Sequence, residues 1–241
     1  MIRIPLSTHD SFSQVAVRFC ISPLFELAAS LSIVAQQAAP QRFLPWVEEM
    51  RTLFVRHRLQ ADWEYFRPLF HSGIPELFDP LQTADVSSTD DVYRYLLLLP
   101  AQPFADSLQA ALASLPKQPV SPAITQDVSE DPGYVKGRLL LFLSAYREFG
   151  FDHTWSAAIH PTLLAQAEKI REALREPTAF LSYLQPLSPA LSYDEHTGEL
   201  VWNAPGPVRT ARELLICPSY YYASPAHLAK KGTRARLLFG I

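Results

Sequence analysis

The spacing of apolar residues changes once along this chain, and this change constrains the fold more than any other feature of the sequence. Up to about residue 184, apolar residues recur at helical spacing, as Leu24, Leu27 and Leu31 do. After residue 190 the apolar residues instead form short runs separated by turn residues, which is typical of strands. The pattern predicts an α+β fold that is predominantly helical, with an N-terminal helical bundle and a small antiparallel β-sheet near the C-terminus.

The first residues of the chain predict a strand and then a short helix. Residues 2–6 alternate between apolar and polar or Pro side chains, and Pro5, which cannot donate to a strand ladder, indicates a sheet edge or the end of a strand. This N-terminal strand is free to join the C-terminal sheet. Residues 7–10 offer N-cap side chains for a helix that runs through Phe19.

Further helices follow from capping residues and from the same spacing. Ser22 as N-cap and Pro23 at the first helical position begin a helix that runs to about Val34. We expect Gly150 to close a later, strongly apolar helix as its C′ residue, and Pro161 to kink the helix that follows. The other predicted helices lie at about residues 45–54, 63–70, 88–99, 104–115, 134–149, 155–175 and 178–184.

A stretch rich in Pro, Ser and Asp interrupts the helices at residues 116–133 and predicts a long loop. The whole chain has 21 prolines against 8 glycines, which favours short elements separated by stiff turns. We treat residues 1–241 as a single domain. The loop can divide it into a helical subdomain, 1–115, and a helical-plus-β subdomain, 134–241.

Apolar runs near the C-terminus supply the predicted sheet. Residues 191–193 and 199–202 indicate a hairpin with a glycine-containing turn. Residues 214–222 and 236–241 follow as two further strands. The last run reaches the final residue with no tail, so we expect a domain that normally continues into another domain or has lost it.

Three consecutive tyrosines at 220–222 are the most unusual local feature. On a strand, Tyr220 and Tyr222 would share one face and Tyr221 would lie on the other. One interpretation is ordinary sheet packing with the hydroxyls at the rim. Another is the wall of a pocket or a dimer surface, because tyrosine combines apolar area with a polar tip. The candidate ligand-binding residues are Trp155, Trp202, Tyr220 and Tyr222.

Charge is distributed unevenly along the chain. The net charge of −3 gives no general attraction to nucleic acid. Residues 209–241 hold six bases and one acid, a net charge of +5, which leaves −8 on the rest of the chain. A solvated rim explains these bases; alternatively they lie at a junction near DNA, where phosphate contacts would add salt-dependent affinity. The candidate DNA-proximal bases are Lys230, Lys231, Arg234 and Arg236.

No residue pattern in the sequence identifies a catalysed reaction. The sequence has no Gly-x-Ser-x-Gly elbow, no P-loop and no dinucleotide fingerprint. His153 and His160 lie seven positions apart, and packed or rim positions explain them better than a metal does. Cys20 and Cys217 lie among apolar residues with no Cys or His at metal-ligand spacing, so we interpret both as buried small hydrophobes in a reducing compartment. We expect no catalytic residues, no metal and no cofactor.

Several short motifs occur in an order that matches a known family pattern. Residues 22–31 follow a predicted strand and short helix, residues 74–80 are similar to a Pro-Asp-Phe-Leu-x-Pro connector, and residues 217–219 are similar to a Val-Pro-Ser element. Pro45 and Trp46 in the third helix, Trp155 at the start of a long helix, and residues 200–202 complete the set. Taken in order over nearly the whole chain, these motifs resemble the N-terminal region of long bacterial ArsR-type transcriptional regulators.

The resemblance implies a regulatory or dimerising domain with no known reaction. In such regulators a winged helix would begin close to where this chain ends, so the resemblance implies either a truncated chain or a stand-alone relative of the N-terminal region. The soft-metal cysteine sites of simpler ArsR repressors have no match in this sequence.

Our first hypothesis is a non-catalytic regulatory or dimerisation domain of a transcriptional regulator. It would sense a small molecule or a partner, form a homodimer and reach DNA only through a C-terminal domain. The alternative is a stand-alone small-molecule-binding protein, or an unrecognised enzyme with a Tyr/Trp-lined pocket; a third is a purely structural dimer module. Because the sequence shows no signal peptide and no apolar run of about 20 residues, we expect a cytoplasmic protein without a membrane partner.

Overall fold

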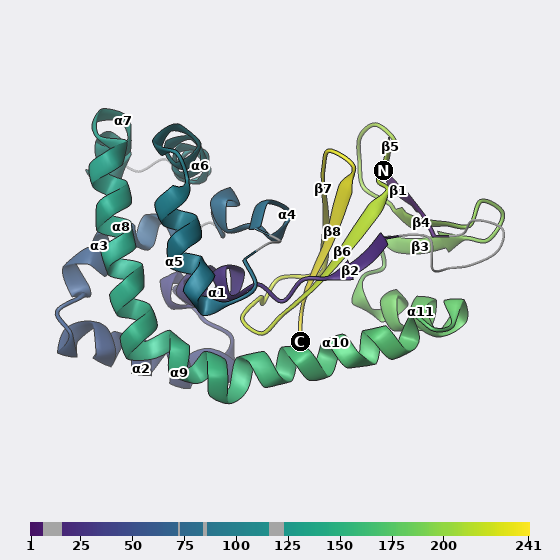
Figure 1. Ribbon diagram of the computed structural model, residues 1–241, viewed down its shortest axis with the longest axis horizontal. Coiled ribbons are helices and arrows are strands. Elements are labelled where there is room, and N and C mark those ends of the chain that lie inside the picture. Colours follow the sequence, from purple (N-terminus) through teal and green to yellow (C-terminus); the bar gives the residue numbers. More distant parts are fainter. Residues whose placement is uncertain (7–15, 72, 84–85, 116–122) are drawn as a thin grey trace. The chain divides into compact units, whose positions relative to one another are not determined.

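The computed structural model describes residues 1–6, 16–71, 73–83, 86–115 and 123–241, and the chain divides into two compact units. The helical unit is Ser22–Ala158, and the β unit combines Met1–Ile21 with Ile159–Ile241. The fold is α+β and mostly helical, as predicted (Figure 1). The chain passes from one unit to the other at Ile21/Ser22 and Ala158/Ile159, whereas the sequence suggested a possible division of the domain within residues 116–133.

The helical unit begins with α1, which has apolar residues on every side. Ser22 caps it, since its Oγ accepts the backbone N–H of Phe25 at 3.1 Å. Nearly every residue of α1 is buried, and the helix packs against α2, α3, α5 and η3, which is the environment that such a uniformly apolar helix requires. The elements of the unit are α1 (Pro23–Ala35), η2 (Gln41–Phe43), α2 (Leu44–Arg56), α3 (Gln60–His71), η3 (Glu76–Phe78), α4 (Pro80–Thr83), α5 (Thr89–Leu98), α6 (Ala101–Ala113), α7 (Ala123–Glu130), α8 (Pro132–Tyr146), η4 (Arg147–Phe151) and α9 (Asp152–Thr154), with η5 (Trp155–Ile159) crossing into the β unit.

Aromatic rings from α2, α3 and α8 fill the centre of the helical unit. Phe54 lies 5.2 Å from Trp63 and 5.9 Å from Tyr146 between ring centroids, and Phe142 stacks on Tyr146 at 6.2 Å. All four rings are buried. They supply large apolar areas with preferred ring geometries, so they are a major stabilising element of this unit.

Two predictions for the helical unit are wrong. Residues 123–130 form α7 where a loop was expected, because Ile124 and Val128 at i, i+4 give this polar segment a buried apolar face. Gly150 does not close a helix but lies in η4, a π-helical segment through which the helix continues. A Cβ at Gly150 would lie 3.0 Å from Met50 Sδ, so close packing against α2 explains this glycine.

The β unit contains two small mixed sheets rather than the single antiparallel sheet predicted. Their strand orders are β3-β4-β1-β5 and β2-β6-β8-β7, and the pairs β1–β5, β2–β6 and β6–β8 are parallel. The parallel pairs arise because distant segments, including the N-terminal ones, enter both sheets. The elements are β1 (Ile2–Pro5), β2 (Ala16–Phe19), α10 (His160–Ala173), α11 (Pro177–Leu184), η6 (Gln185–Leu187), β3 (Leu191–Asp194), β4 (Glu199–Trp202), β5 (Arg209–Thr210), β6 (Glu213–Ser219), β7 (His227–Lys231) and β8 (Arg234–Gly240).

The N-terminal segment gives one confirmed prediction and one wrong one. β1 pairs with β4 and β5, and Pro5 is its last residue, so the expected strand joins a sheet and Pro5 ends it. The helix expected to reach Phe19 is not found there, because β2 occupies residues 16–19. Pairing with the buried strand β6 decides this local conformation; residues 7–15 lie outside the described part of the chain.

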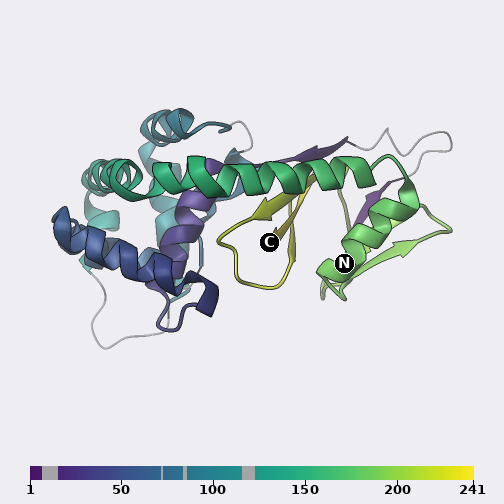
Figure 2. The same ribbon diagram turned by 90° about the horizontal axis from the view of Figure 1, so that it is seen from below.

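The core of the β unit lies between the strands and the helices α10 and α11. It contains Ile170 of α10, Phe180 of α11, Leu214 of β6 and Leu237 of β8, and Figure 2 shows α10 as a long helix beside the strands. β6 and β8 are buried on both faces, which is typical of strands in parallel pairs. The final apolar run of the sequence is therefore an interior strand of its sheet.

Candidate ligand-binding site

The β unit contains a hollow of about 350 Å³ between α11 and the β3–β4 hairpin. Its volume lies near the lower end of the range of small-molecule sites. The lining residues all belong to the β unit: Leu181, Leu184, Gln185, Leu191, Ser192, Tyr193, Glu195 and Leu200.

The floor of the hollow is apolar because α11 and the hairpin place their leucines on the same core. Leu184, Leu191 and Leu200 are buried members of the β-unit core, and Leu181 packs against them while remaining partly exposed. Pro177 in the first turn of α11 begins this helix, and η6 ends it before the chain enters β3. The sequence therefore builds a firm hydrophobic surface at this position.

The rim of the hollow is polar, and the turn of the hairpin fixes part of it. The Asp194 carboxylate accepts the backbone N–H groups of His196 at 3.0 Å and Thr197 at 3.4 Å, and Gly198 completes the turn with φ of 66°. Hydrogen bonds from Thr197 and His196 hold the pKa of Asp194 below its usual value. The exposed Glu195 projects from this ordered turn and lines the hollow.

Taken together, the floor and the rim suit a small amphipathic molecule. The leucines would contact a hydrocarbon part, while Gln185, Ser192 and Glu195 offer hydrogen-bond acceptors at the edge. Asn203 already donates to Ser192 Oγ at 3.2 Å, which holds that hydroxyl in place. Glu195 would favour a ligand with a donor or a positive charge at its polar end.

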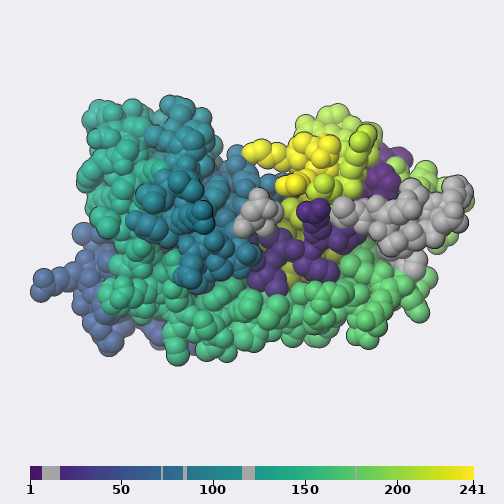
Figure 3. All heavy atoms as spheres, in the orientation of Figure 1, coloured from purple at the N-terminus to yellow at the C-terminus, as the bar shows by residue number. Residues whose placement is uncertain are grey.

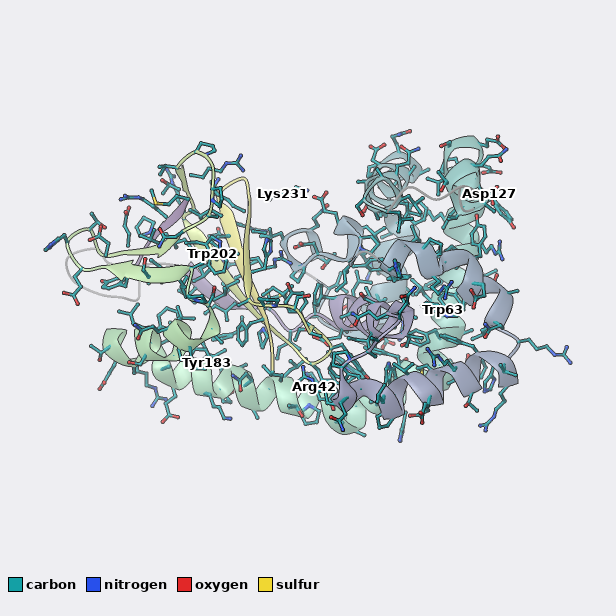
Figure 4. All side chains as sticks on the ribbon, turned by 180° about the vertical axis from the view of Figure 1, so that it is seen from behind. Arg42, Trp63, Asp127, Tyr183, Trp202 and Lys231 are labelled. Carbon is teal, nitrogen blue, oxygen red and sulfur yellow. The ribbon has the colours of Figure 1, made fainter. Side chains whose placement is uncertain are left out.

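The predicted aromatic site residues do not line this hollow. Trp202 is buried at the end of β4 and belongs to the β-unit core, as Figure 4 shows for its position in the sheet. Tyr220 and Tyr222 follow the end of β6 at Ser219, so they lie in a loop and not on the strand that was predicted. Trp155 is buried against Phe151, 5.8 Å between ring centroids, and belongs to the helical unit.

The loop holds the tyrosines through local contacts. Tyr221 is buried and meets the Tyr220 ring edge-on at 5.1 Å. Tyr222 donates its hydroxyl to the Pro225 carbonyl at 3.3 Å, and burial raises the pKa of that hydroxyl. The tyrosines therefore pack within a loop, and neither the sheet-packing interpretation nor the pocket interpretation assumed that position.

The four predicted DNA-proximal bases lie on the β7–β8 hairpin but in different environments. Lys230 and Lys231 directly precede the turn at Gly232, where Lys230 Nζ donates to the Gly232 carbonyl at 2.5 Å. Arg234 forms an ion pair with Glu213 at 2.9 Å. Arg236 is only 5% exposed, and its Nη2 lies 3.4 Å from His227 Nδ1, so this base does not contribute to an exposed basic surface.

The residues of the hollow were missed by sequence reasoning. Both walls were predicted, since the short helix before residue 184 and the hairpin after residue 190 were recognised. What the sequence did not provide was their packing against each other. A partial signal was present in the leucines of both segments, because two adjacent amphipathic elements must bury their apolar faces somewhere.

Comparisons with family models, with curated proteins and with solved structures find no match for this chain. The resemblance to ArsR-type regulators therefore stays a prediction. Across the described residues, no helix combines the length and the apolar character that crossing a membrane requires. The same residues contain no group of three His, Cys, Asp or Glu side chains arranged to hold a metal ion.

Proposed function

We propose that this chain is a non-catalytic, ligand-sensing region of a bacterial transcriptional regulator of the ArsR type. The observation that carries the proposal is the hollow between α11 and the β3–β4 hairpin, with its leucine floor and acceptor-bearing rim. The order of sequence motifs supplies the link to regulators, and DNA would be contacted through a winged-helix domain of the same protein.

The position of the hollow supports a sensing role. One wall is α11, which follows α10. α10 in turn follows the π-helical segment η5, whose last residue, Ile159, begins the second segment of the β unit. A ligand that draws α11 towards the hairpin would favour one arrangement of these helices over another. Such differential binding is the physical requirement for a ligand to shift a conformational equilibrium.

A thermal-shift screen with small amphipathic amines, carboxylates and alcohols tests the binding step. A ligand that binds the folded state raises the melting temperature, and above Kd the rise grows with the logarithm of the ligand concentration. Leu181→Trp fills the hollow and should abolish the shift. Leu164→Trp is the matched control, because Leu164 is a partly exposed leucine on α10 outside the lining and should leave the shift unchanged.

Two outcomes would overturn the proposal. An equal shift for wild type and Leu181→Trp would place the ligand elsewhere, and no shift with any compound class would remove the sensing role. The regulatory step is tested separately by transcript profiles of the source organism after deletion of the gene and complementation. Unchanged transcripts on deletion would contradict a role in transcription, and turnover of a bound compound would favour the enzyme alternative.

A dimerisation role has its own support in the helical unit. α5 and α8 lie side by side, since Lys136 Nζ donates to the carbonyls of Leu97 at 2.8 Å and Leu99 at 2.5 Å (Figures 1 and 3). Leu98 on α5 is 69% exposed and Leu141 on α8 is 74% exposed. Exposed apolar side chains gathered on neighbouring helices favour a protein contact. The other large exposed hydrophobic residues on these helices are Tyr93, Leu97 and Tyr134.

Light scattering at several concentrations tests this second role. We expect a dimer for wild type and a monomer for Leu98→Glu combined with Leu141→Glu, because a buried unpaired charge opposes association. Val55→Glu on α2 is the control, since Val55 is also 69% exposed but lies on another helix. A monomeric wild type, or a dimer that survives both substitutions, would contradict the assignment.

A further inference from the structure

The two cysteines of the chain, far apart in sequence, are brought together by a strand ladder. β2 pairs with β6 in parallel, and Phe19 is the register partner of Ile216. The next residues in this register are Cys20 and Cys217. The backbone N–H of Cys20 donates to the Ile216 carbonyl at 3.0 Å, which is the bond that a parallel ladder makes when Cys20 lies opposite Cys217.

Both thiols also lie on the same face of the sheet. Leu214 and Ile216 of β6 point into the core beneath α10 and α11, and Val17 and Phe19 of β2 pack against that core. Because side chains alternate along a strand, Cys217 and Cys20 point to the opposite face together. Neighbouring strands lie about 4.8 Å apart, which is within the roughly 4.4–6.8 Å between Cα atoms that disulfides require.

The surroundings of the pair limit its reactivity to small reagents. Cys20 is 6% exposed and Cys217 is 2% exposed. β2 is an edge strand of its sheet, so Cys20 is reached by a local opening of one ladder, whereas Cys217 lies on an interior strand. Neither cysteine forms a disulfide in this structure.

We propose that Cys20 and Cys217 form a reversible redox-modification site whose oxidant is a small peroxide. Cys20 as thiolate attacks one peroxide oxygen and breaks the O–O bond, which gives a sulfenic acid and a hydroxide; the proton lost by the Cys20 thiol converts that hydroxide to water. The Cys217 thiol then attacks the sulfenic sulfur, which forms the S–S bond and releases the sulfenic oxygen as a second water. Together the two thiols lose two electrons, and one hydrogen peroxide accepts them and is reduced to two waters. A dithiol reductant returns both cysteines to thiols by thiol–disulfide exchange.

The place of this bond in the chain gives it a structural consequence. Cys20 immediately precedes the point where the chain leaves the β unit, at Ile21/Ser22. A disulfide would fasten this exit segment to β6 and close a loop that contains the whole helical unit. Because cross-links that close long loops restrict the unfolded chain most, oxidation should raise the melting temperature, by about 5–15 °C.

The test uses the purified full chain treated with hydrogen peroxide and then quenched. The number of thiols titrated in denaturant should fall from two per chain to none, and the intact mass should drop by the mass of two hydrogens. Peptide mapping without reductant should recover a linked peptide pair containing Cys20 and Cys217, and dithiothreitol should restore both thiols. Since the chain has 2 cysteines, an intramolecular disulfide can join no other pair.

Cys20→Ala is the control, because it removes the edge-strand partner and should abolish both the linked peptide and the oxidised rise in melting temperature. Cys217→Ala should abolish both as well. If Cys217→Ala on the interior strand prevents folding, Cys20→Ala alone is the control. The proposal is overturned if both wild-type thiols persist under peroxide, if they advance to sulfinic or sulfonic acids, or if the bond forms between two chains. The mass of oxidised wild type tests the proposal even if neither variant folds.

Discussion

The two units of this protein are built from the chain in different ways. The helical unit is one uninterrupted stretch, Ser22–Ala158, whereas the β unit combines Met1–Ile21 with Ile159–Ile241. In the helical unit, each α-helix is formed by hydrogen bonds between residues four apart. In the β unit, β1 pairs with β4 and β2 pairs with β6, so nearly two hundred residues separate the partners. The difference predicts that the β unit forms late, because long-range contacts require costly loop closure.

The units also fill their cores differently. The helical unit concentrates aromatic rings, with Phe54 in contact with Trp63, Phe142 and Tyr146. The β unit relies mainly on aliphatic side chains from strands and from α10 and α11. A single large-to-small substitution in a core should therefore destabilise mainly the unit that contains it. The range of residues that it destabilises tests this difference between the units.

The largest effects should come from Phe54→Ala in the helical unit and Leu237→Ala in the β unit. Both side chains are fully buried. Phe54→Ala should lower the free energy of unfolding by about 3–5 kcal/mol, and Leu237→Ala should lower it by about 2–5 kcal/mol. Hydrogen-exchange mass spectrometry should show faster exchange mainly in residues 22–158 for Phe54→Ala. For Leu237→Ala it should show faster exchange mainly in residues 1–21 and 159–241.

The exchange pattern decides between two units and one. If each substitution accelerates exchange equally throughout the chain, the units unfold as a single cooperative body. Val55→Ala and Val208→Ala are suitable controls, because both valines are more than half exposed and should change exchange little.

A matched pair of arginines sharpens the comparison at an intermediate scale. Arg138 in the helical unit donates to Asp62 at 2.8 Å and lies 3.8 Å above the Tyr65 ring, whereas Arg3 in the β unit donates to Glu199 at 2.8 Å. Arg138→Gln should lower the free energy of unfolding by about 1 kcal/mol or slightly more, since it removes a partly exposed ion pair and a cation–π contact. Arg3→Gln should lower the free energy of unfolding by less. Urea unfolding measures both, and a larger loss for Arg3→Gln would contradict the role given to the Tyr65 ring.

A buried hydroxyl pair gives the next prediction. Ser30 Oγ donates to the Leu27 carbonyl at 2.7 Å, so its one hydrogen is used and it accepts from the Tyr146 hydroxyl at 2.7 Å. Tyr146→Phe should therefore lower the free energy of unfolding by about 1 kcal/mol. Because burial raises the pKa of Tyr146, its contribution is present below the usual tyrosine pKa of about 10 and is lost as pH rises towards the folded value.

Alkaline titration of stability checks this sign. Wild type should lose stability steeply above about pH 10, and Tyr146→Phe should lose less over the same range. Tyr93→Phe is the control, because Tyr93 is 43% exposed. Equal alkaline slopes for Tyr146→Phe and wild type would contradict the assignment to Tyr146.

The same contrast between units explains how much the sequence could predict. α1 was recognised from its cap and spacing, and Ser22 Oγ accepts from the Phe25 N–H as expected. α5 was recognised from its spacing, and Ser88 Oγ caps it by accepting from the Asp91 N–H. These are local signals, and most of the helical unit consists of such elements. β2 was mistaken for a helix end, because its strand conformation depends on β6, almost two hundred residues away.

The candidate site was less predictable than the elements around it. The tyrosines at 220–222 attracted attention as an unusual run, yet the strand ends at Ser219 and the three rings pack in a loop. The hollow is lined by ordinary leucines and a few polar residues that carry no motif. The pairing of Cys20 with Cys217 was equally hidden, because spacing in the sequence says nothing about the register of two strands.

The smallest effect should come from the turn that forms the rim of the hollow. Asp194 accepts the N–H groups of His196 and Thr197, and these bonds lower its pKa. The contribution is therefore present above the unfolded pKa of about 3.9 and is lost as pH falls through the lower folded value. Asp194→Ala should reduce the melting temperature by about 1–2 °C at pH 7, and the difference from wild type should shrink below about pH 4. Glu195→Ala removes a neighbouring carboxylate that does not brace the turn and should leave the melting temperature unchanged, so an equal loss for both variants would show that charge, and not the turn, is responsible.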